Sequence, residues 1–336
     1  MTSYHDRARG AFAGFVLGDS LGMPTRAMSG ENIIATYGFV IGLGPASTVQ
    51  PMNPGMGTGS VTSRTEHALL VASMIDGGPI DPTRLARLMV AWDDRARMAG
   101  RLDLLEAESR YGFDQLLAGV PGDHRSTTCE PTAWVLPLGL AHSSEQCSDL
   151  GDAVYVTCQS THRSRQAVEG AALFAHIISA GVDGAGVDDA IEYGLEIVAS
   201  TPRRGEWTSE SSVIARTLQA IDWAENLRDI EIGAHLHDIV GLSKRAGEAI
   251  PAAIIIAKAF SHDPCRGLCL AAQIGGETCA IGSMAGAILG ACLGIEAFPQ
   301  PVLAQIAKNA AEDALDLADR LVLLSGRGTA VKGSIG

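Results

Sequence analysis

Residues Ile274–Gly294 read IGGETCAIGSMAGAILGACLG, an apolar run of small residues with one carboxylate near its start. Gly275 and Gly276 permit a tight turn in which the backbone comes close to neighbouring atoms. The alanines and glycines that follow predict a helix whose small faces let other helices approach closely. Glu277 and Cys279 lie at the N-terminal end of this helix, where unpaired N–H groups favour an anion. The segment fits either a carboxylate presented to a cavity or a plain core helix with an N-terminal glutamate.

Two further segments have a matching character. Gly14–Pro24 reads GFVLGDSLGMP, and Gly59–Leu70 reads GSVTSRTEHALL, where a threonine-rich turn opens another apolar helix. Together the three segments resemble the ADP-ribosylglycohydrolase family, whose members carry GxxxGDxxGxP, then a TDDT turn opening a helix, then GGDTDT before a small-residue helix. Shorter stretches in the family order extend the resemblance, and these are Pro137–Ala141, Thr161–Ala171 and Glu248–Ala253.

The chain departs from this pattern where the family's carboxylates and threonines hold two divalent cations. The TDDT turn becomes TSRT at residues 62–65, and the DTDT motif becomes ETCA at residues 277–280. A further acidic ligand of the family would fall near Arg26. Hard cations require several oxygen ligands with negative charge, whereas the guanidinium of Arg64 stays positive at any useful pH. We therefore expect neither a divalent metal nor another cofactor in this pocket.

Residues 128–135 read TCEPTAWV, where the family carries a glycine-rich loop against the distal ribose and phosphates of its substrate. Backbone N–H groups of small residues can approach phosphate oxygens, but the carboxylate of Glu130 would repel a diphosphate. Trp134 either offers a flat face to a base or packs in the core. The change favours a smaller ribosylated substrate, uncharged or cationic, over an ADP-ribosyl group.

Three other residues have both a functional and a structural interpretation. Asp19 could be catalytic, but we expect it to brace a helix near the pocket. His162 either binds a ribose hydroxyl, as the resemblance implies, or stabilises a helix start. Cys279 would be nucleophilic if the helix N-terminus lowered its thiol pKa, but no base neighbours it in sequence, so we expect it to line the pocket. Ligation of a soft metal by Cys279 and His162 is disfavoured, because no CxxC or HxxxH spacing lies near them.

The resemblance and the departures together predict a metal-independent hydrolase of an N-glycosidic bond in a ribosylated small molecule such as a nucleoside. Such a reaction passes through an oxocarbenium-like transition state and needs a carboxylate near the anomeric carbon and an acid for the leaving group. We expect Glu277 to activate water or stabilise the cation, and Glu130 to contact or protonate the leaving group. The expected substrate-binding residues are Asp19, Thr62, Ser63, Arg64, Trp134, His162 and Cys279.

Two other functions stay open at this stage. A catalytically inactive relative would bind a nucleotide-like ligand or a partner protein as a sensor, and its cavity would be filled. An enzyme would have a water-accessible cavity that both Glu277 and Glu130 face. In the third hypothesis a metal is held by unexpected ligands and the chain is an ordinary ADP-ribosyl hydrolase. The leaving group, the anomeric preference and the oligomeric state do not follow from the sequence.

Composition favours an all-α fold, and the family resemblance implies a compact orthogonal multi-helix bundle in one domain over residues 1–336. Aromatic residues make up 5% of the chain and glycine is abundant, which suits close helix–helix packing, and no linker or low-complexity tract divides the sequence. The expected helices are Tyr4–Gly18, Ser63–Ile75, Asp81–Met98, Leu102–Leu117, Cys129–Ala141, Ser148–Cys158, Arg165–Ala180, Val187–Ala199, Ser209–Asn226, Ile230–Gly241, Ala249–Ser261, Cys265–Gly275, Cys279–Gly294 and Pro301–Leu324.

Charge and cysteine content narrow the partners and the compartment. A net charge of −13 argues against a basic surface for nucleic acid. Seven scattered cysteines argue against a secreted disulfide framework, and the polar segment Met1–Arg9 does not resemble a signal peptide. The apolar run after Ile281 is broken by glycines and is short for a membrane span. We therefore expect a cytoplasmic protein whose partner is a small ribosylated molecule.

Overall fold

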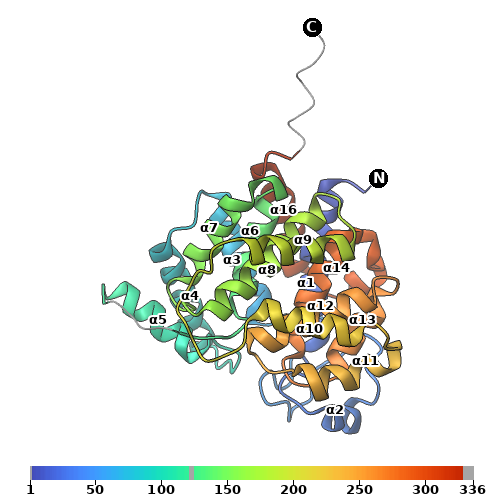
Figure 1. Cartoon of the computed structure of the whole chain (residues 1–336). Helices are drawn as coiled ribbons and strands as arrows, with labels where there is room; N and C mark the ends of the chain where they lie inside the picture. Colours follow the sequence, from blue (N-terminus) through green and yellow to red (C-terminus); the bar gives the residue numbers. More distant parts are fainter. Residues whose placement is uncertain (1, 121–124, 328–336) are drawn as a thin grey trace.

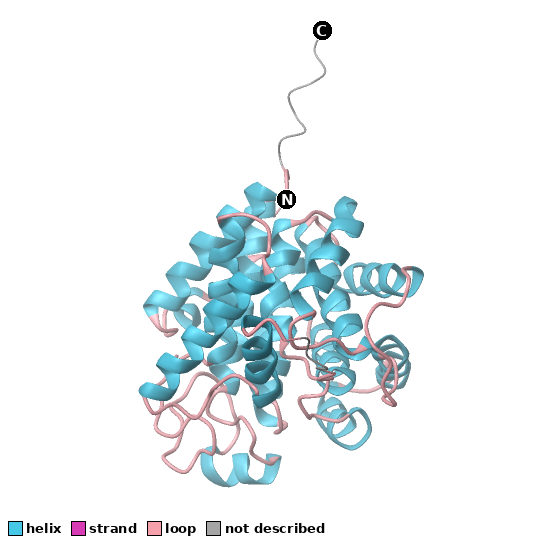
Figure 2. Cartoon of the chain, turned by 90° about the vertical axis from the view of Figure 1, so that its left-hand side faces the viewer, coloured by secondary structure: helices cyan, strands magenta, loops and turns pink. Residues whose placement is uncertain are grey.

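The computed structural model describes residues 2–120 and 125–327, and in these residues the chain folds into helices without a β-strand (Figures 1 and 2). The prediction of an all-α fold is confirmed. The α-helices are α1 (Tyr4–Gly22), α2 (Gly30–Tyr37), α3 (Ser63–Asp76), α4 (Pro82–Met98), α5 (Ala107–Leu117), α6 (Pro131–Ala141), α7 (Cys147–Cys158), α8 (Arg165–Val182), α9 (Val187–Ser200), α10 (Val213–Ala224), α11 (Asp229–His235), α12 (Ala246–Ala259), α13 (Pro264–Gln273), α14 (Thr278–Leu293), α15 (Gln300–Leu303) and α16 (Lys308–Leu324). Short 3₁₀ or π turns cover Ser144–Gln146, Leu236–Val240 and Ile295–Ala297.

The helices α1 and α14, from opposite ends of the chain, form the central pair of the bundle (Figure 1). They are antiparallel, and glycines of one helix face glycines of the other. A Cβ atom built on Gly14 would lie 2.1 Å from the carbonyl oxygen of Gly286, and one built on Gly18 would lie 2.0 Å from that of Gly282. No side chain fits at these positions, so the small-residue pattern has the predicted effect of bringing two backbones into direct contact.

The turn before α14 also behaves as expected. Gly275 has φ +91° and Gly276 has φ +70°, a conformation that glycine adopts at little cost. A Cβ atom on Gly276 would lie 2.3 Å from the carbonyl oxygen of Leu242. The backbone of Gly276 exchanges hydrogen bonds with residues 27 and 28 at 2.8 and 3.0 Å. The turn therefore holds two chain segments close to the start of α14.

Two predicted helices are wrong in extent. Residues 102–106 are not helical, because Asp103 accepts hydrogen bonds from the backbone and hydroxyl of Ser63 at the start of α3. The expected helix Pro301–Leu324 is divided into α15 and α16, since the turn between them packs on Gly59, whose carbonyl oxygen accepts a hydrogen bond from the backbone of Ala307. The short helix α2 was not expected.

In the part of the chain that the structure describes, no helix combines the length and the apolar character that crossing a bilayer requires. The residues of α14 from Thr278 to Cys292 are all buried inside the bundle. The interpretation of this apolar run as a core helix is therefore confirmed.

Candidate active site

A narrow cavity lies where the N-terminal ends of α3, α6 and α14 meet. The N-terminal end of a helix carries unpaired N–H groups and partial positive charge, so three such ends favour negative charge or hydrogen-bond acceptors. The empty volume is about 390 Å³ with its solvent-open part included. The lining residues are Arg26, Ser63, Arg64, His67, Leu104, Glu106, Cys129, Glu130, Ala133, Lys244, Glu277 and Ala280.

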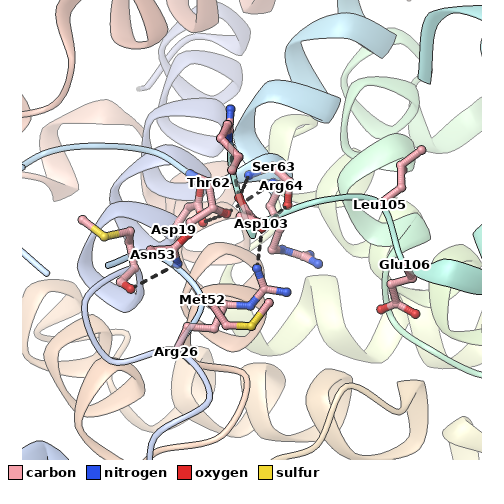
Figure 3. A network of polar contacts seen from close by, with 12 residues as sticks. Asp19, Arg26, Met52, Asn53, Thr62, Ser63, Arg64, Asp103, Leu105 and Glu106 are labelled. Carbon is pink, nitrogen blue, oxygen red and sulfur yellow. Dashed lines mark hydrogen bonds and ion pairs between the residues drawn. The ribbon is translucent and has the colours of Figure 1, made fainter. Parts of the chain in front are cut away.

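Glu277 stands at the N-terminus of α14, and its partner is Arg26. Arg26 Nε donates to Glu277 Oε2 at 3.2 Å, and its Nη1 donates to Asp103 Oδ1 at 2.7 Å. Both carboxylates favour the protonated guanidinium and raise the pKa of Arg26 against the opposing effect of burial. Figure 3 shows Arg26 extending toward Asp103 from the segment after α1. This guanidinium therefore joins two carboxylates that come from different ends of the molecule.

The start of α3 is held by two aspartates. Asp19, completely buried on α1, accepts hydrogen bonds from the backbone and hydroxyl of Thr62 at 2.8 and 2.6 Å and from Thr65 Oγ1 at 2.7 Å. Asp103 accepts from the backbone and hydroxyl of Ser63 at 2.5 and 2.8 Å (Figure 3). Burial raises the pKa of Asp19. Asp19 thus braces α3 behind the cavity, and neither it nor Thr62 reaches the cavity wall.

Arg64, in the first turn of α3, is a buried cation whose hydrogen-bond partners are hydroxyl groups. Its Nε donates to Ser283 Oγ at 3.1 Å and its Nη2 donates to Thr132 Oγ1 at 2.7 Å. Among the described residues, no carboxylate lies within ion-pairing distance of this guanidinium, which also lies over the ring of Phe15. A buried charge is costly unless it finds a partner. Because Arg64 also lines the cavity, it is suited to contacting ligand oxygens.

Glu130 lies just before α6 and is deeply buried beside a second glutamate. Burial, and then the negative charge of Glu106, raise the pKa of Glu130 to about 8. Ser109 donates a hydrogen bond to Glu130, while Glu106 forms an ion pair with Lys244 at 3.2 Å. Two neighbouring carboxyl groups titrate as a pair, and the buried member without a cationic partner retains the proton. Glu130 is therefore a carboxylic acid at neutral pH.

His67 adds a neutral imidazole to the cavity wall. Burial lowers its pKa to about 3, and its Nε2 atom has no hydrogen-bond partner among the residues that the structure describes. Its ring packs edge-on against Trp92 at a centroid distance of 4.3 Å. An unpaired buried polar atom is uncommon in native proteins, and this one belongs to a residue of the cavity wall.

Besides Asp19 and Thr62, three residues expected to bind substrate lie outside the cavity wall. His162 is fully buried, with its nitrogens hydrogen-bonded to Thr128 and Thr161 at 2.8 Å, which corresponds to its structural interpretation. Trp134 packs in the core, with its ring centroid 5.5 Å from that of His162, so it offers no face to a base. Cys279 packs in a small buried apolar cluster, and burial raises its thiol pKa well above the usual value. This last finding argues against a thiolate nucleophile.

The residues at the family's cation positions do not fit two divalent ions. Both oxygens of Asp103 are engaged by Arg26 and by the start of α3, Asp19 is engaged by threonines, and Arg26 stands next to one oxygen of Glu277, where its positive charge disfavours a cation. Elsewhere in the described chain, Glu106, Glu130 and His162 offer three ligand atoms within 4.8 Å of one another. His162 Nε2 already pairs with a hydroxyl and Glu130 accepts from Ser109. These possible metal-ligand atoms are thus already hydrogen-bonded to protein groups.

Of the predicted residues, the structure brings Glu277, Glu130, Ser63 and Arg64 to one cavity. Several other ionisable residues line the same cavity or brace its wall without having been predicted as site residues, and these are Arg26, His67, Asp103, Glu106 and Lys244. The cavity therefore has more carboxylates around it than the motifs alone indicate. The segment RLDLLE at residues 101–106 has a pattern from which two of these site residues, Asp103 and Glu106, could have been predicted, because its closely spaced charges precede a helix.

Comparisons with known proteins agree with the fold and with the motifs. The sequence profile of the ADP-ribosylglycohydrolase family matches residues 1–330. An uncharacterized protein from Escherichia coli (strain K12), YegU, is 27% identical over 307 residues, which is 90% of this chain and 92% of that protein. An uncharacterized protein of Archaeoglobus fulgidus is 26% identical over 297 residues, covering 85% of this chain and 87% of that protein.

A solved structure of an ADP-ribosylglycohydrolase-related protein complex has the same fold, with a TM-score of 0.69 and 21% sequence identity. The match covers 97% of this chain and 100% of that one. The family profile extends over almost the whole sequence, and the helix pair that carries the first and last motifs is the centre of the fold. The chain therefore belongs to the ADP-ribosylglycohydrolase family.

Proposed function

We propose that this chain hydrolyses the N-glycosidic bond of a small ribosylated molecule, such as a nucleoside, without a divalent metal. The observation that carries the proposal is one cavity lined by two carboxyl groups in different environments. Glu130 is buried beside Glu106, and burial raises its pKa to about 8, whereas Glu277 is ion-paired with Arg26. Environments that separate the protonation states of two carboxyl groups in this way are typical of an acid and a base in glycoside hydrolysis.

The proposed reaction uses each group once. Glu277 takes a proton from a water molecule as the water oxygen attacks the anomeric carbon. The bond from the anomeric carbon to the leaving nitrogen breaks with its electron pair going to nitrogen, and Glu130 donates its proton to the leaving group. Positive charge that develops on the ribose ring is stabilised by the negative charge of Glu277.

The cationic side of the cavity is assigned to the ribose. Arg64 has hydroxyl partners and no ion-pair partner in the described chain, and Ser63 lies beside it at the start of α3. Guanidinium and hydroxyl groups can donate to ribose oxygens. These residues stand at the positions where the family resemblance implies cations, so we propose that they orient the sugar in place of the cations.

The wall beside α6 favours a small substrate without a diphosphate. Glu130 lies where the resemblance implies a phosphate-binding loop, and Glu106, which is paired with Lys244, lies next to Glu130. A diphosphate would meet carboxyl groups in a narrow space instead of free backbone N–H groups. We therefore propose that ADP-ribosyl-arginine and ADP-ribosyl-serine are poor substrates.

The test is release of free ribose or ADP-ribose from a panel of nucleosides, nicotinamide riboside, ADP-ribosyl-arginine and ADP-ribosyl-serine. We expect release from at least one nucleoside-like compound by the native protein and by Glu196→Gln, a control on the exposed side of α9. Glu277→Gln should have little activity. Faster release from an ADP-ribosyl compound would restore the ordinary family function. Binding without release from any compound would identify an inactive relative.

A further inference from the structure

A second and larger cavity lies between α7, α8, α9 and the segment of residues 201–212 that leads to α10. Its empty volume is about 1220 Å³ with the solvent-open part included, compared with about 390 Å³ at Glu277. The two cavities share no lining residue. Small-molecule sites are usually concave, with polar groups that orient the ligand, and the walls of the larger cavity combine apolar side chains with many polar and charged ones.

A buried histidine on α8 has an unpaired nitrogen in this wall. His176 is 2% exposed, and its Nδ1 atom has no hydrogen-bond partner within the described part of the chain. Burial lowers its pKa to about 4, so the ring is neutral at physiological pH. Because this Nδ1 atom has almost no accessible surface, His176 forms part of the uncharged wall of the cavity.

The cavity also has cations whose charge is not balanced locally. Arg165 and Arg203 line it, and among the described residues neither has a carboxylate within ion-pairing distance. Of the two glutamates of the wall, Glu210 forms an ion pair with Arg245 at 3.4 Å, so Glu169 alone opposes the charge of these two arginines within the wall. Glu169 accepts hydrogen bonds from the start of α10, and Glu210 accepts one from Thr127 at 2.9 Å. The wall therefore favours an anion, although the whole chain has a net charge of −13.

An exposed indole completes the wall. Trp207 has 67% of its surface exposed, which is unusual for the largest apolar side chain. The neighbouring Arg204 already has partners, because it forms an ion pair with Asp152 and lies over the ring of Tyr155 at 5.3 Å. Indole faces are suited to stacking on planar rings. Trp207 thus offers a free aromatic surface at a cavity whose other arginines lack carboxylate partners.

We propose that this cavity is a binding site for a small aromatic anion. The planar ring stacks on Trp207, and the anionic group pairs with Arg165 and Arg203. The site is separate from the proposed hydrolytic cavity and does not depend on hydrolytic activity.

Ligand-observed NMR titration tests the proposal with four probes. These are 2-naphthoate and 2-naphthyl phosphate, which are aromatic anions, then 2-naphthalenemethanol, which lacks charge, and inorganic phosphate, which lacks a ring. From the size of the probes we expect dissociation constants on the order of 1 mM or below for the two anions. The neutral alcohol and inorganic phosphate should each bind at least about tenfold more weakly. The stronger of the two anions distinguishes a carboxylate from a phosphate ligand.

Variants test whether the aromatic anions bind in this cavity. Trp207→Ala and Arg203→Ala, both at exposed positions, should each weaken the binding of the aromatic anions by about tenfold or more without altering the circular dichroism spectrum. The matched controls Trp223→Ala and Arg87→Ala, also exposed, should bind like the native protein. Glu277→Gln should bind normally as well, because it changes the other cavity.

Several results would overturn the assignment. The first is no saturable binding of either anion, and the second is binding that survives both Trp207→Ala and Arg203→Ala. Equal affinity for the neutral alcohol would remove the role of the arginines. Loss of binding in Glu277→Gln would place the anion in the hydrolytic cavity instead.

Discussion

The protonated state of Glu130 can be tested without a substrate, through the pH dependence of stability in a Glu130→Gln variant. Glutamine is similar in size, cannot ionise, and keeps a carbonyl oxygen that can accept the hydrogen bond from Ser109. In the native protein the folded-state pKa of Glu130 is about 8, above its ordinary value of 4.5. The carboxyl group therefore contributes stability at pH below 4.5, and this contribution is lost as the pH rises toward 8.

The sign and size follow from proton linkage. Between pH 4.5 and 8 the unfolded chain releases the proton of Glu130 while the folded chain keeps it. The free energy of unfolding then falls by up to about 1.4 kcal/mol per pH unit through this group. Summed over the interval, the loss is on the order of a few kcal/mol. Above pH 8 both states are ionised, and the curve is flat with respect to this group.

Urea unfolding at intervals from pH 5 to pH 9 measures the effect. At pH 5 the variant should be about as stable as the native protein, and by pH 8 it should be more stable by on the order of a few kcal/mol. Glu196→Gln, at an exposed position of α9, should show no such trend. A difference that is independent of pH, or one that favours the native protein at high pH, would refute a protonated Glu130. The proposed acid would then be lost as well.

Three other outcomes are expected. Glu277→Gln should lower ribose release by about a hundredfold or more, as removal of an acid–base group does, while Arg26 keeps Asp103 as a partner and the urea midpoint changes little. Activity should be unchanged by EDTA, and activity that disappears with chelator and returns with magnesium would contradict metal independence. Gly286→Ala should destabilise by about 3 kcal/mol or more in urea unfolding, because its Cβ would lie 2.0 Å from a backbone oxygen of α1. Gly151→Ala, on α7 with open space around it, should be neutral or stabilising.

The central helix pair was predictable because its cause is local. Glycines spaced by four residues in both Gly10–Gly22 and Gly282–Gly290 leave a continuous strip without side chains, and two such strips can pack only against each other. The glycine pair before Glu277 similarly has one physical consequence, a tight turn. Such patterns predict structure from sequence because no other residue type satisfies the same steric condition.

The electrostatics of the site were less predictable because they depend on long-range contacts. The segment that contains Asp103 was expected to be helical, and only its hydrogen bonds to Ser63 show why it is not. The resemblance indicates that Arg26 stands in place of an acidic ligand. It does not identify the two carboxylate partners of Arg26, which are Asp103 and Glu277. Likewise, the sequence does not tell whether a tryptophan ring faces a ligand or the core. The ring of Trp134 faces the core.

The arrangement of charge explains how the fold can persist without the cations that the family resemblance implies. Carboxylates that converge at one place repel one another unless positive charge lies between them. Here Arg26 supplies that charge between Asp103 and Glu277, at 2.7 and 3.2 Å. A guanidinium is part of the chain and cannot dissociate, so the wall of the cavity is assembled when the protein folds. In the proposed metal-independent reaction, the activation of water, which a bound metal would otherwise supply, falls to a carboxylate. Of the carboxylates that line the cavity, Glu277 is paired through only one oxygen, at its Oε2 atom, which leaves the other oxygen to accept a proton from water.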